Sequence, residues 1–294
     1  IKKLNSSEVI LLENLRYYKE EEQGDVGFSE KLSKLADIYI NDAFGTAHRA
    51  HASTSVITRF FKKTCFCGLL LEKEMSNLNL VLKNPKRPFT AIIGGAKISG
   101  KIEIILSLLE KVDKIIIGGG MAYTFIKAMG GNIGKSIFEE DKLILAKKII
   151  RVARKKNVKL VLPVDSINNI SFSNNNQASI SDIYKIPKDK MGLDIGPNSI
   201  LLFEKHILES KTILWNGPMG VFEFSNFSNG TKSIGKAICT STLNGAFSLI
   251  GGGDSIAASK LFGLSEGLSY ISTGGGAMLE YIQGKELPGI KALL

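Results

Sequence analysis

The chain has 294 residues, of which 44% are hydrophobic and 22% are charged, a composition typical of a soluble globular protein of about two domains. No apolar stretch approaches the roughly 20 residues of a membrane-spanning helix and no signal peptide is apparent, so we expect a cytoplasmic protein without a membrane partner. The net charge of +10 comes from lysines spread along the chain, which argues against a nucleic-acid partner and suits a small anionic substrate.

Short apolar runs recur along the chain and predict strands. Most are rich in Ile, Val and Leu and lack polar alternation, as in strands buried on both faces of a parallel sheet. They are residues 9–12, 38–40, 90–94, 114–118, 159–163, 212–215, 247–251 and 269–272. Amphipathic helical patterns separate the later runs, for example at 101–112 and 139–157. This alternation of strand and helix predicts an α/β fold with a doubly wound sheet.

Prolines mark the end of a helix in the first third of the chain. A helical pattern over 70–84 ends at Asn84, because Pro85 and Pro88 follow. We therefore place a domain boundary at residue 85. The polar stretch 167–182 is predicted to be an excursion within the second domain.

Glycine clusters follow four of the predicted strands. They lie in "AIIGGAK" (91–97), "IIIGGGM" (115–121), "SLIGGGDSIAAS" (248–259) and "YISTGGGAM" (270–278), and "WNGPMG" (215–220) is a fifth glycine-bearing turn. Glycine there lets a phosphate approach the backbone, and the helix that follows offers free N–H groups. Close packing of helix on strand explains one such cluster equally well, but four in one domain favour a nucleotide-binding crevice. None has the P-loop or G-x-G-x-x-G spacing.

Two lysines follow the first glycine cluster. Lys97 and Lys101 are four residues apart and are predicted to share a face in the first turns of a helix. Two cations there repel each other and oppose the helix macrodipole, unless an anion lies between them. Two solvated lysines are the alternative, but the position beside two glycines favours a phosphate site.

The segment "YINDAFGTAHRAHASTS" (39–55) places an arginine and two histidines among small residues. Arg49 can bind a carboxylate or phosphate through two parallel hydrogen bonds. His48 and His51 are residues that more often have a structural role than an acid–base one. Arg16, which follows another predicted strand, is similar to Arg49, and its alternative role is an ion pair with one of the glutamates after it.

These segments resemble the phosphoglycerate kinase family, of bacterial type, over the whole chain. The matching stretches are "LLENLRYYKEEE", "YINDAFGTAHRAHAS", "LLLEKE", "AIIGGAKISGKI", "IIGGGMAYTF", "LPVD", "MGLDIGP", "ILWNGPMGVFE", "GGGDSIAA" and "STGGGAMLEYIQGKELPGI". The resemblance implies two doubly wound parallel-sheet (Rossmann-like) domains, with the N-terminal one only partly present, because family members begin about a hundred residues earlier. The implied parts are the C-terminal part of the 3-phosphoglycerate domain (1–69), an interdomain hinge helix (70–84), the nucleotide-binding domain (85–276) and a tail that packs back on the N-terminal domain (277–294).

The resemblance also implies site residues. Arg16 and Arg49 would hold 3-phosphoglycerate, while Lys97 and the helix N-termini at Gly253 and Gly276 would face the transferred phosphoryl group. The residues implied for the nucleotide are Lys101, Gly118, Gly119, Gly192, Leu193, Glu223, Gly252, Gly253, Asp254 and Ser255.

Different parts of the nucleotide are implied to contact different members of this set. Glu223 would accept hydrogen bonds from the ribose, and Asp254 would meet a Mg²⁺ ion. The glycines before Asp254 would contact the phosphates.

The implied reaction is the glycolytic, reversible transfer of a phosphoryl group between 1,3-bisphosphoglycerate and MgADP, giving 3-phosphoglycerate and MgATP. The reacting carboxylate is ionised at neutral pH, so no general base is required, and the protein supplies positioning and positive charge. The substrates would bind to different domains of a monomer, so a hinge must close.

Other functions remain open at this stage. Within the family, the alternative is a truncated nucleotide-binding remnant without activity. Outside it, the alternatives are a dehydrogenase, against which the missing G-x-G-x-x-G argues, and a basic nucleic-acid binder. Salt-sensitive RNA or DNA binding without MgADP affinity would favour the latter.

Overall fold

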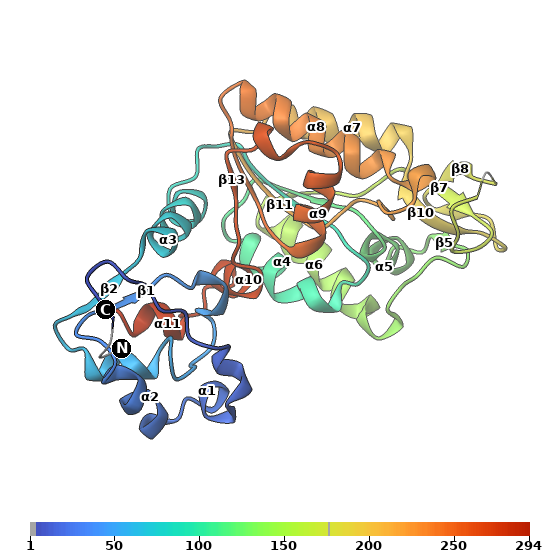
Figure 1. Ribbon diagram of the computed structural model, residues 1–294. Coiled ribbons are helices and arrows are strands. Elements are labelled where there is room, and N and C mark those ends of the chain that lie inside the picture. The colour runs from blue at the N-terminus through green and yellow to red at the C-terminus, as the bar shows by residue number, and fades with distance from the viewer. Residues whose placement is uncertain (1–3, 176) are drawn as a thin grey trace. The chain divides into compact units, whose positions relative to one another are not determined.

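The computed structural model describes residues 4–175 and 177–294 and divides into two compact units (Figure 1). Unit 1 comprises Ile1–Ser76 and Gly276–Leu294, and unit 2 comprises Asn77–Gly275. The boundary falls within α3 (Leu69–Leu82), where the sequence predicts a helix. The functional roles expected of the two parts stay predictions.

Unit 2 is built on a six-stranded parallel sheet with the strand order β13-β12-β11-β3-β4-β6. The strands are β3 (Phe89–Ile93), β4 (Lys114–Ile117), β6 (Lys159–Val161), β11 (Thr212–Asn216), β12 (Phe247–Ile250) and β13 (Tyr270–Ile271). Every residue of β3 and β11 is buried. The continuous apolar runs therefore form central strands, and the predicted α/β class is confirmed.

Helices cover both faces of this sheet, with α7 and α8 on one face and α4 and α6 on the other (Figure 1). They are α4 (Ile102–Leu108), α5 (Met121–Ala128), α6 (Leu143–Lys155), α7 (Pro197–Leu208), α8 (Asn229–Leu243) and α9 (Gly253–Leu261). The 3₁₀ turns are η4 (Ser99–Lys101), η5 (Glu140–Lys142), η6 (Ser225–Phe227) and η7 (Ser265–Gly267). Trp215 of β11, Phe203 of α7 and Ile234 of α8 are fully buried in one core. No helix in the described ranges is both long and apolar enough to cross a bilayer.

A second, antiparallel sheet lies beside the first in unit 2. Its order is β10-β7-β8, formed by β7 (Asp165–Asn169), β8 (Ser179–Asp182) and β10 (Met191–Ile195). A two-stranded parallel sheet pairs β5 (Asn132–Ile133) with β9 (Lys185–Ile186). The polar stretch 167–182 thus contributes to two paired strands. Its polar side chains bond across them, as where Asn168 Nδ2 donates to Ser181 Oγ at 2.8 Å.

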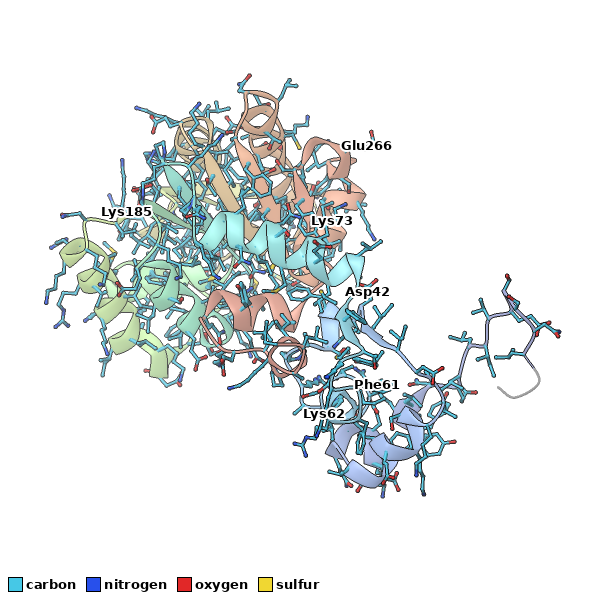
Figure 2. The ribbon with its side chains drawn as sticks, turned by 90° about the vertical axis from the view of Figure 1, so that its left-hand side faces the viewer. Asp42, Phe61, Lys62, Lys73, Lys185 and Glu266 are labelled. Atoms are coloured by element: carbon cyan, nitrogen blue, oxygen red, sulfur yellow. The ribbon has the colours of Figure 1, made fainter. Side chains whose placement is uncertain are left out.

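Unit 1 contains short elements around a two-stranded parallel sheet. They are η1 (Leu15–Tyr17), α1 (Lys19–Gln23), α2 (Val26–Ser33), β1 (Tyr39–Asn41), η2 (Phe44–Thr46), η3 (Val56–Phe60), β2 (Cys65–Cys67), α10 (Gly276–Ile282) and α11 (Pro288–Lys291). Gly289 joins the last segment to this unit by donating its N–H to Ala47 O at 2.8 Å. Asp42 lies beside the start of α3 (Figure 2) and accepts a hydrogen bond from Leu71 N at 2.9 Å.

The strand predicted at 9–12 is wrong. These residues belong to no helix or strand, and Val9 and Leu11 are 92% and 96% exposed. A strand must share its backbone hydrogen bonds with a neighbouring strand, and no segment in the described part of the chain pairs with this one.

Candidate active site

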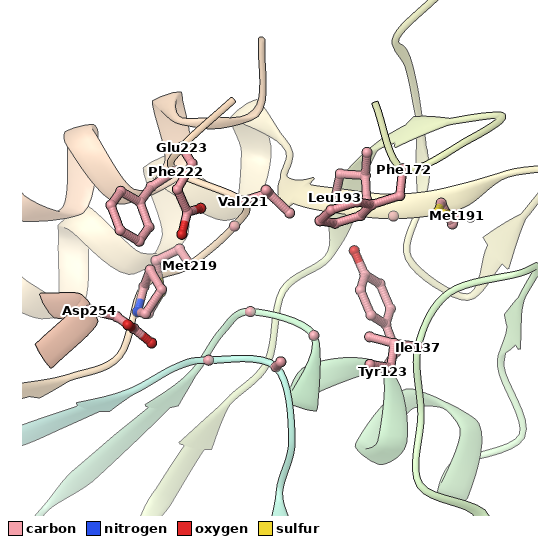
Figure 3. A pocket seen from close by; sticks show the side chains of 17 residues that line it. Tyr123, Ile137, Phe172, Met191, Leu193, Met219, Val221, Phe222, Glu223 and Asp254 are labelled. Atoms are coloured by element: carbon pink, nitrogen blue, oxygen red, sulfur yellow. The ribbon is translucent and has the colours of Figure 1, made fainter. Parts of the chain in front are cut away.

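A cavity of about 370 Å³ opens at the carboxyl edge of the six-stranded sheet (Figure 3). It lies where the chain leaves two neighbouring strands in opposite directions, from β3 towards β4 and from β11 towards β12. Ligands of open parallel sheets bind at such a switch point. The cavity is lined by Gly95, Ala96, Gly119, Gly120, Tyr123, Ile137, Phe172, Met191, Gly192, Leu193, Pro218, Met219, Gly220, Val221, Phe222, Glu223 and Asp254.

Half of the residues predicted to bind the nucleotide are among these lining residues. They are Gly119, Gly192, Leu193, Glu223 and Asp254. Gly118 lies behind the wall instead, and a methyl group on it would overlap the side chain of Met219, which does line the cavity. The structure therefore brings these predicted residues together, while their individual contacts with a nucleotide stay predictions.

Backbone hydrogen bonds join the loops that form the floor of the cavity. Gly95 N donates to Pro218 O at 3.0 Å, and Gly119 N donates to Met219 O at 3.0 Å. Gly119 has a φ of +66°, and a Cβ built on it would lie 2.6 Å from Gly95 N. Glycine is thus required both for the backbone conformation and for the close approach of two loops.

Gly119→Ala is expected to lower the free energy of unfolding by about 2 kcal/mol or more and to weaken ADP binding, because strain at positive φ is combined with overlap. The matched control is Gly130→Ala, which has a φ of +91° and open space around its Cβ. Calorimetric unfolding and ADP titration of both variants would test this. Equal losses in the two variants would show that overlap at residue 119 contributes nothing.

Lys97 and Lys101 do not share a helical face, so that prediction is wrong. The chain after β3 forms a loop and then η4, so Lys97 lies before the helix begins. The glycines around it disfavour an earlier helix start. Lys97 is exposed and has no hydrogen-bond or ion-pair partner in the described residues, whereas Lys101 donates from Nζ to Asn216 Oδ1. Burial lowers the pKa of Lys101, and the nearby Asp254 carboxylate opposes this shift.

Asn216 is a site residue that sequence reasoning missed. It ends β11, is 1% exposed, and donates from Nδ2 to Gly251 O at 2.7 Å while it accepts from Lys101. It therefore connects three of the loops beside the cavity. Its only signal in the sequence is a polar residue directly after an apolar run and before a glycine.

Sequence reasoning also missed the apolar wall of the cavity, because the residues that form it come from elements that are distant in sequence. Tyr123 of α5, Phe172 after β7 and Met191 of β10 all line it. The Tyr123 hydroxyl bonds Ser166 Oγ at 2.8 Å, and burial raises its pKa. A methyl group on Gly192 would overlap the Tyr123 hydroxyl, so this glycine makes room for the ring.

The last glycine-rich turn before a helix in unit 2 leads into α9. Gly252 caps this nine-residue helix with a φ of +94°, and Asp254 in the first turn lines the cavity. Ser255 Oγ is fully buried and accepts from Gly217 N at 2.5 Å, so its hydroxyl links the turn to the loop after β11. The first amides of α9 remain without intrahelical partners.

A second set of predicted residues lies in unit 1. Arg16 and Arg49 are exposed, and no acidic side chain of the described residues pairs with either, which excludes the predicted alternative for Arg16. Arg49 Nε donates to His48 Nε2 at 3.3 Å. Burial lowers the pKa of His51, the Glu21 carboxylate 3.9 Å from its Nδ1 opposes this shift, and the charges of Arg16 and Arg49 add to it. We call the two arginines and the two histidines the basic cluster.

Glu21 holds the backbone of the segment that carries part of the basic cluster. It is 3% exposed and accepts from Ser53 N at 3.0 Å and from Ser53 Oγ at 2.6 Å. These bonds tie α1 to the segment that carries Arg49. One glutamate of the predicted "KEEE" run therefore supports the backbone and pairs with neither arginine.

Known proteins resemble this chain over almost its whole length. A model of the family described as phosphoglycerate kinase matches residues 1–285. The chain belongs to the phosphoglycerate kinase family. It is 53% identical to the phosphoglycerate kinase of Porphyromonas gingivalis and 50% identical to that of Koribacter versatilis, over 99% of this chain and 75% and 72% of those proteins.

Solved structures give the same result. The phosphoglycerate kinase of Coxiella burnetii matches with a TM-score of 0.91 at 43% identity, covering 97% of this chain and 72% of that one. That of Pyrococcus horikoshii matches with a TM-score of 0.82 at 32% identity, covering 99% and 74%.

Family membership confirms the predicted enzyme class. As a member of the phosphoglycerate kinase family, the protein is a transferase of glycolysis that acts on ADP or ATP and on phosphorylated glycerates. The comparisons do not favour an inactive remnant, and they rule out the dehydrogenase alternative.

Proposed function

We propose that the unit 2 cavity is the nucleotide site of this kinase, with the base at its apolar end and the phosphates at the end near α9. Figure 3 supports this by showing Tyr123 and Leu193 at one end of the cavity, and Glu223 and Asp254 at the other. The observation that carries the proposal is the position of the cavity at the switch point of the sheet. Glu223 accepts hydrogen bonds from the ribose hydroxyls.

The phosphates are bound by the start of α9 and by Lys101. The amides of Gly252, Gly253 and Ser255 face the phosphate oxygens, since free N–H groups and the helix dipole both favour an anion at a helix N-terminus. Lys101 is held near by Asn216 and needs only to exchange that partner for a phosphate oxygen.

Asp254 fits a Mg²⁺ ion that accompanies the nucleotide. Its carboxylate lines the cavity, and it has no hydrogen-bond partner among the described residues. Those residues contain no cluster of three or more His, Cys, Asp or Glu that could hold a metal alone. Mg²⁺ commonly uses one or two carboxylates together with phosphate oxygens and water, so a single aspartate is sufficient. When bound, the ion supplies charge neutralisation at the phosphates.

The basic cluster of unit 1 binds the glycerate substrate. Arg16 and Arg49 present guanidinium groups that pair with no acidic side chain of the described residues, and each can bind a carboxylate or phosphate with two parallel bonds. Their mutual repulsion decreases when an anionic substrate lies between them. This is the positive charge that the sequence led us to expect for a small anionic substrate.

Phosphoryl transfer then depends on positioning and charge. The attacking oxygen in the direction of ATP consumption is already an ionised carboxylate, so no side chain has to remove a proton. Lys97 and the amides at Gly253 and Gly276 face the charge that develops on the transferred group. Gly276 opens α10 in unit 1, and Lys97 and Gly253 belong to unit 2. Transfer therefore requires hinge movement about α3.

The remaining predictions complete this proposal. Unit 1 corresponds to the 3-phosphoglycerate domain and unit 2 to the nucleotide domain. The enzyme acts as a cytoplasmic monomer.

Replacing Glu223 tests the nucleotide site. Glu223→Ala is expected to lower the affinity for ADP about tenfold, because the loss of hydrogen bonds to a charged group costs about 1.5–3 kcal/mol. Isothermal calorimetry with ADP and Mg²⁺ on the full chain measures it. Glu266→Ala, which removes an exposed glutamate of the same unit, is the control and leaves the affinity unchanged. Equal affinity of Glu223→Ala and the control would remove Glu223 from the ribose role.

A further inference from the structure

The segment that carries Glu223 is a long loop whose position must be fixed by contacts. It runs over residues 217–228, between β11 and α8, and we call it the Glu223 loop. Besides its bonds to the loops that form the cavity floor, its first half is bonded to α8 and to β10: Met219 N donates to Thr231 Oγ1 at 3.0 Å, and Val221 N donates to Leu193 O at 2.8 Å. Because Leu193 and Val221 both line the cavity, the strand β10 is the support on which the loop rests.

Asp194 follows Leu193 on that strand and contacts Gly220 in the loop and the first turn of α8 directly after it. Its side chain is 1% exposed, and its Oδ2 accepts from Gly230 N, in the first turn of α8, at 2.7 Å. Its Oδ1 accepts from Ile195 N at 2.9 Å. A methyl group on Gly220 or on Gly230 would overlap Oδ1. The carboxyl group thus fills the space between the start and the end of the Glu223 loop.

Burying the Asp194 carboxyl group without a cationic partner costs free energy of desolvation. No Lys, Arg or His of the described residues pairs with Asp194, and burial raises its pKa to about 8 although the two backbone N–H groups lower it. Asp194 does more than cap a helix, because its Oδ2 bonds the start of α8 while its Oδ1 lies against Gly220 of the loop.

A second buried aspartate shows what capping alone looks like. Asp165 is 4% exposed and accepts from Asn198 N at 2.9 Å and Ser199 N at 2.8 Å at the start of α7. It does not line the cavity, and its side chain accepts hydrogen bonds from Asn198 and Ser199 rather than from the Glu223 loop. The two aspartates have the same chemistry and burial, and they differ in the segment that they hold.

We propose that Asp194 is a positioning residue for nucleotide binding, which fastens the Glu223 loop to β10 and so holds the Glu223 carboxylate at the ribose. The proposal rests on the ribose role proposed above for Glu223. It predicts that the effect of changing Asp194 passes through Glu223.

The first test compares Asp194→Asn with Asp165→Asn. An asparagine side chain keeps the shape but turns one acceptor into a donor, so Gly230 N or Ile195 N loses its partner. ADP affinity, measured by calorimetry with Mg²⁺, should fall about tenfold for Asp194→Asn, the loss expected when the Glu223 carboxylate no longer meets the ribose, and less than twofold for Asp165→Asn. Both variants should lose stability in thermal unfolding. Equal changes in affinity for the two variants would overturn the proposal.

The second test is a double-mutant cycle with Glu223→Ala. If Asp194 acts through Glu223, adding Asp194→Asn to Glu223→Ala lowers ADP affinity no further. With 2′,3′-dideoxy-ADP as the probe, Asp194→Asn and the unmodified protein should bind equally. Losses that multiply in the double variant would overturn the positioning role, whereas an unchanged affinity of Glu223→Ala alone would refute the ribose role itself.

A different variant applies if Asp194→Asn does not fold. Gly230→Ala keeps the carboxyl group and displaces it, because the new methyl group overlaps Asp194 Oδ1. Gly235→Ala is its control in the same helix, where the new methyl group meets the flexible end of Leu264. ADP affinity should fall several-fold for Gly230→Ala only, and this loss should be absent with 2′,3′-dideoxy-ADP. A loss of the same size with both nucleotides would contradict the proposal.

Discussion

Lys97→Ala is expected to lower turnover by on the order of 10²–10³ and to change ADP affinity less than about twofold, by analogy with the removal of a single oxyanion-hole donor. Lys97 lies in the loop after β3, exposed and without a partner among the described residues. Its ammonium group is therefore free to meet charge that is present only while the phosphoryl group is between donor and acceptor. Interactions made only in the transition state raise turnover and leave ground-state affinity unchanged.

Lys101→Ala is expected to have the opposite effect, weakening ADP binding more than turnover. Lys101 is mostly buried, bonded to Asn216 and close to Asp254, so it is suited to bind nucleotide phosphates in the ground state. Its removal should weaken ADP binding about tenfold, the scale of a lost bond to a charged group. Steady-state kinetics and ADP calorimetry on both variants separate the roles. Normal turnover of Lys97→Ala, or a defect only in its ADP affinity, would mean that the two lysines form one phosphate clamp.

The parts of the site that the sequence predicted are those in which backbone conformation requires one residue type. Gly119 and Gly252 have positive φ, and each lies just after a largely apolar run that forms a strand of the parallel sheet. Since parallel strands end at one edge of a sheet, these turns had to converge. The cavity at the switch point was therefore predictable before any contact was known.

The parts that could not be predicted depend on contacts between distant segments. Asp194 sits in an apolar strand pattern, and only its bond to Gly230, 36 residues later, separates it from the helix-capping Asp165. The helix start near Lys97 was misplaced because glycine-rich turns delay the first helical hydrogen bond by an amount that periodicity does not encode. Residues 9–12 have the apolar pattern of a strand but no partner strand in the described chain, and pairing is a property of the fold rather than of the run.

Arg49→Lys is expected to raise the KM for 3-phosphoglycerate about 10–100-fold, the range for losing bonds to a charged group, and to leave the KM for ATP within about twofold. In the basic cluster, Arg49 Nε donates to His48 Nε2, which leaves its two terminal nitrogens to bind a substrate. A lysine keeps the charge but has neither the second terminal nitrogen nor the Nε that bonds His48. The substitution therefore removes the two-bond contact with the substrate and the bond to His48 that orients the side chain.

The control for this substitution is Arg59→Lys, which makes the same change at another exposed arginine of unit 1. It should leave both KM values unchanged, because Arg59 does not belong to the basic cluster. His48→Ala adds a second comparison: it removes the acceptor that orients Arg49 and should raise the KM for 3-phosphoglycerate by less than Arg49→Lys does. If Arg49→Lys changes the KM of both substrates alike, Arg49 supports the fold of unit 1, and the glycerate is bound by other residues.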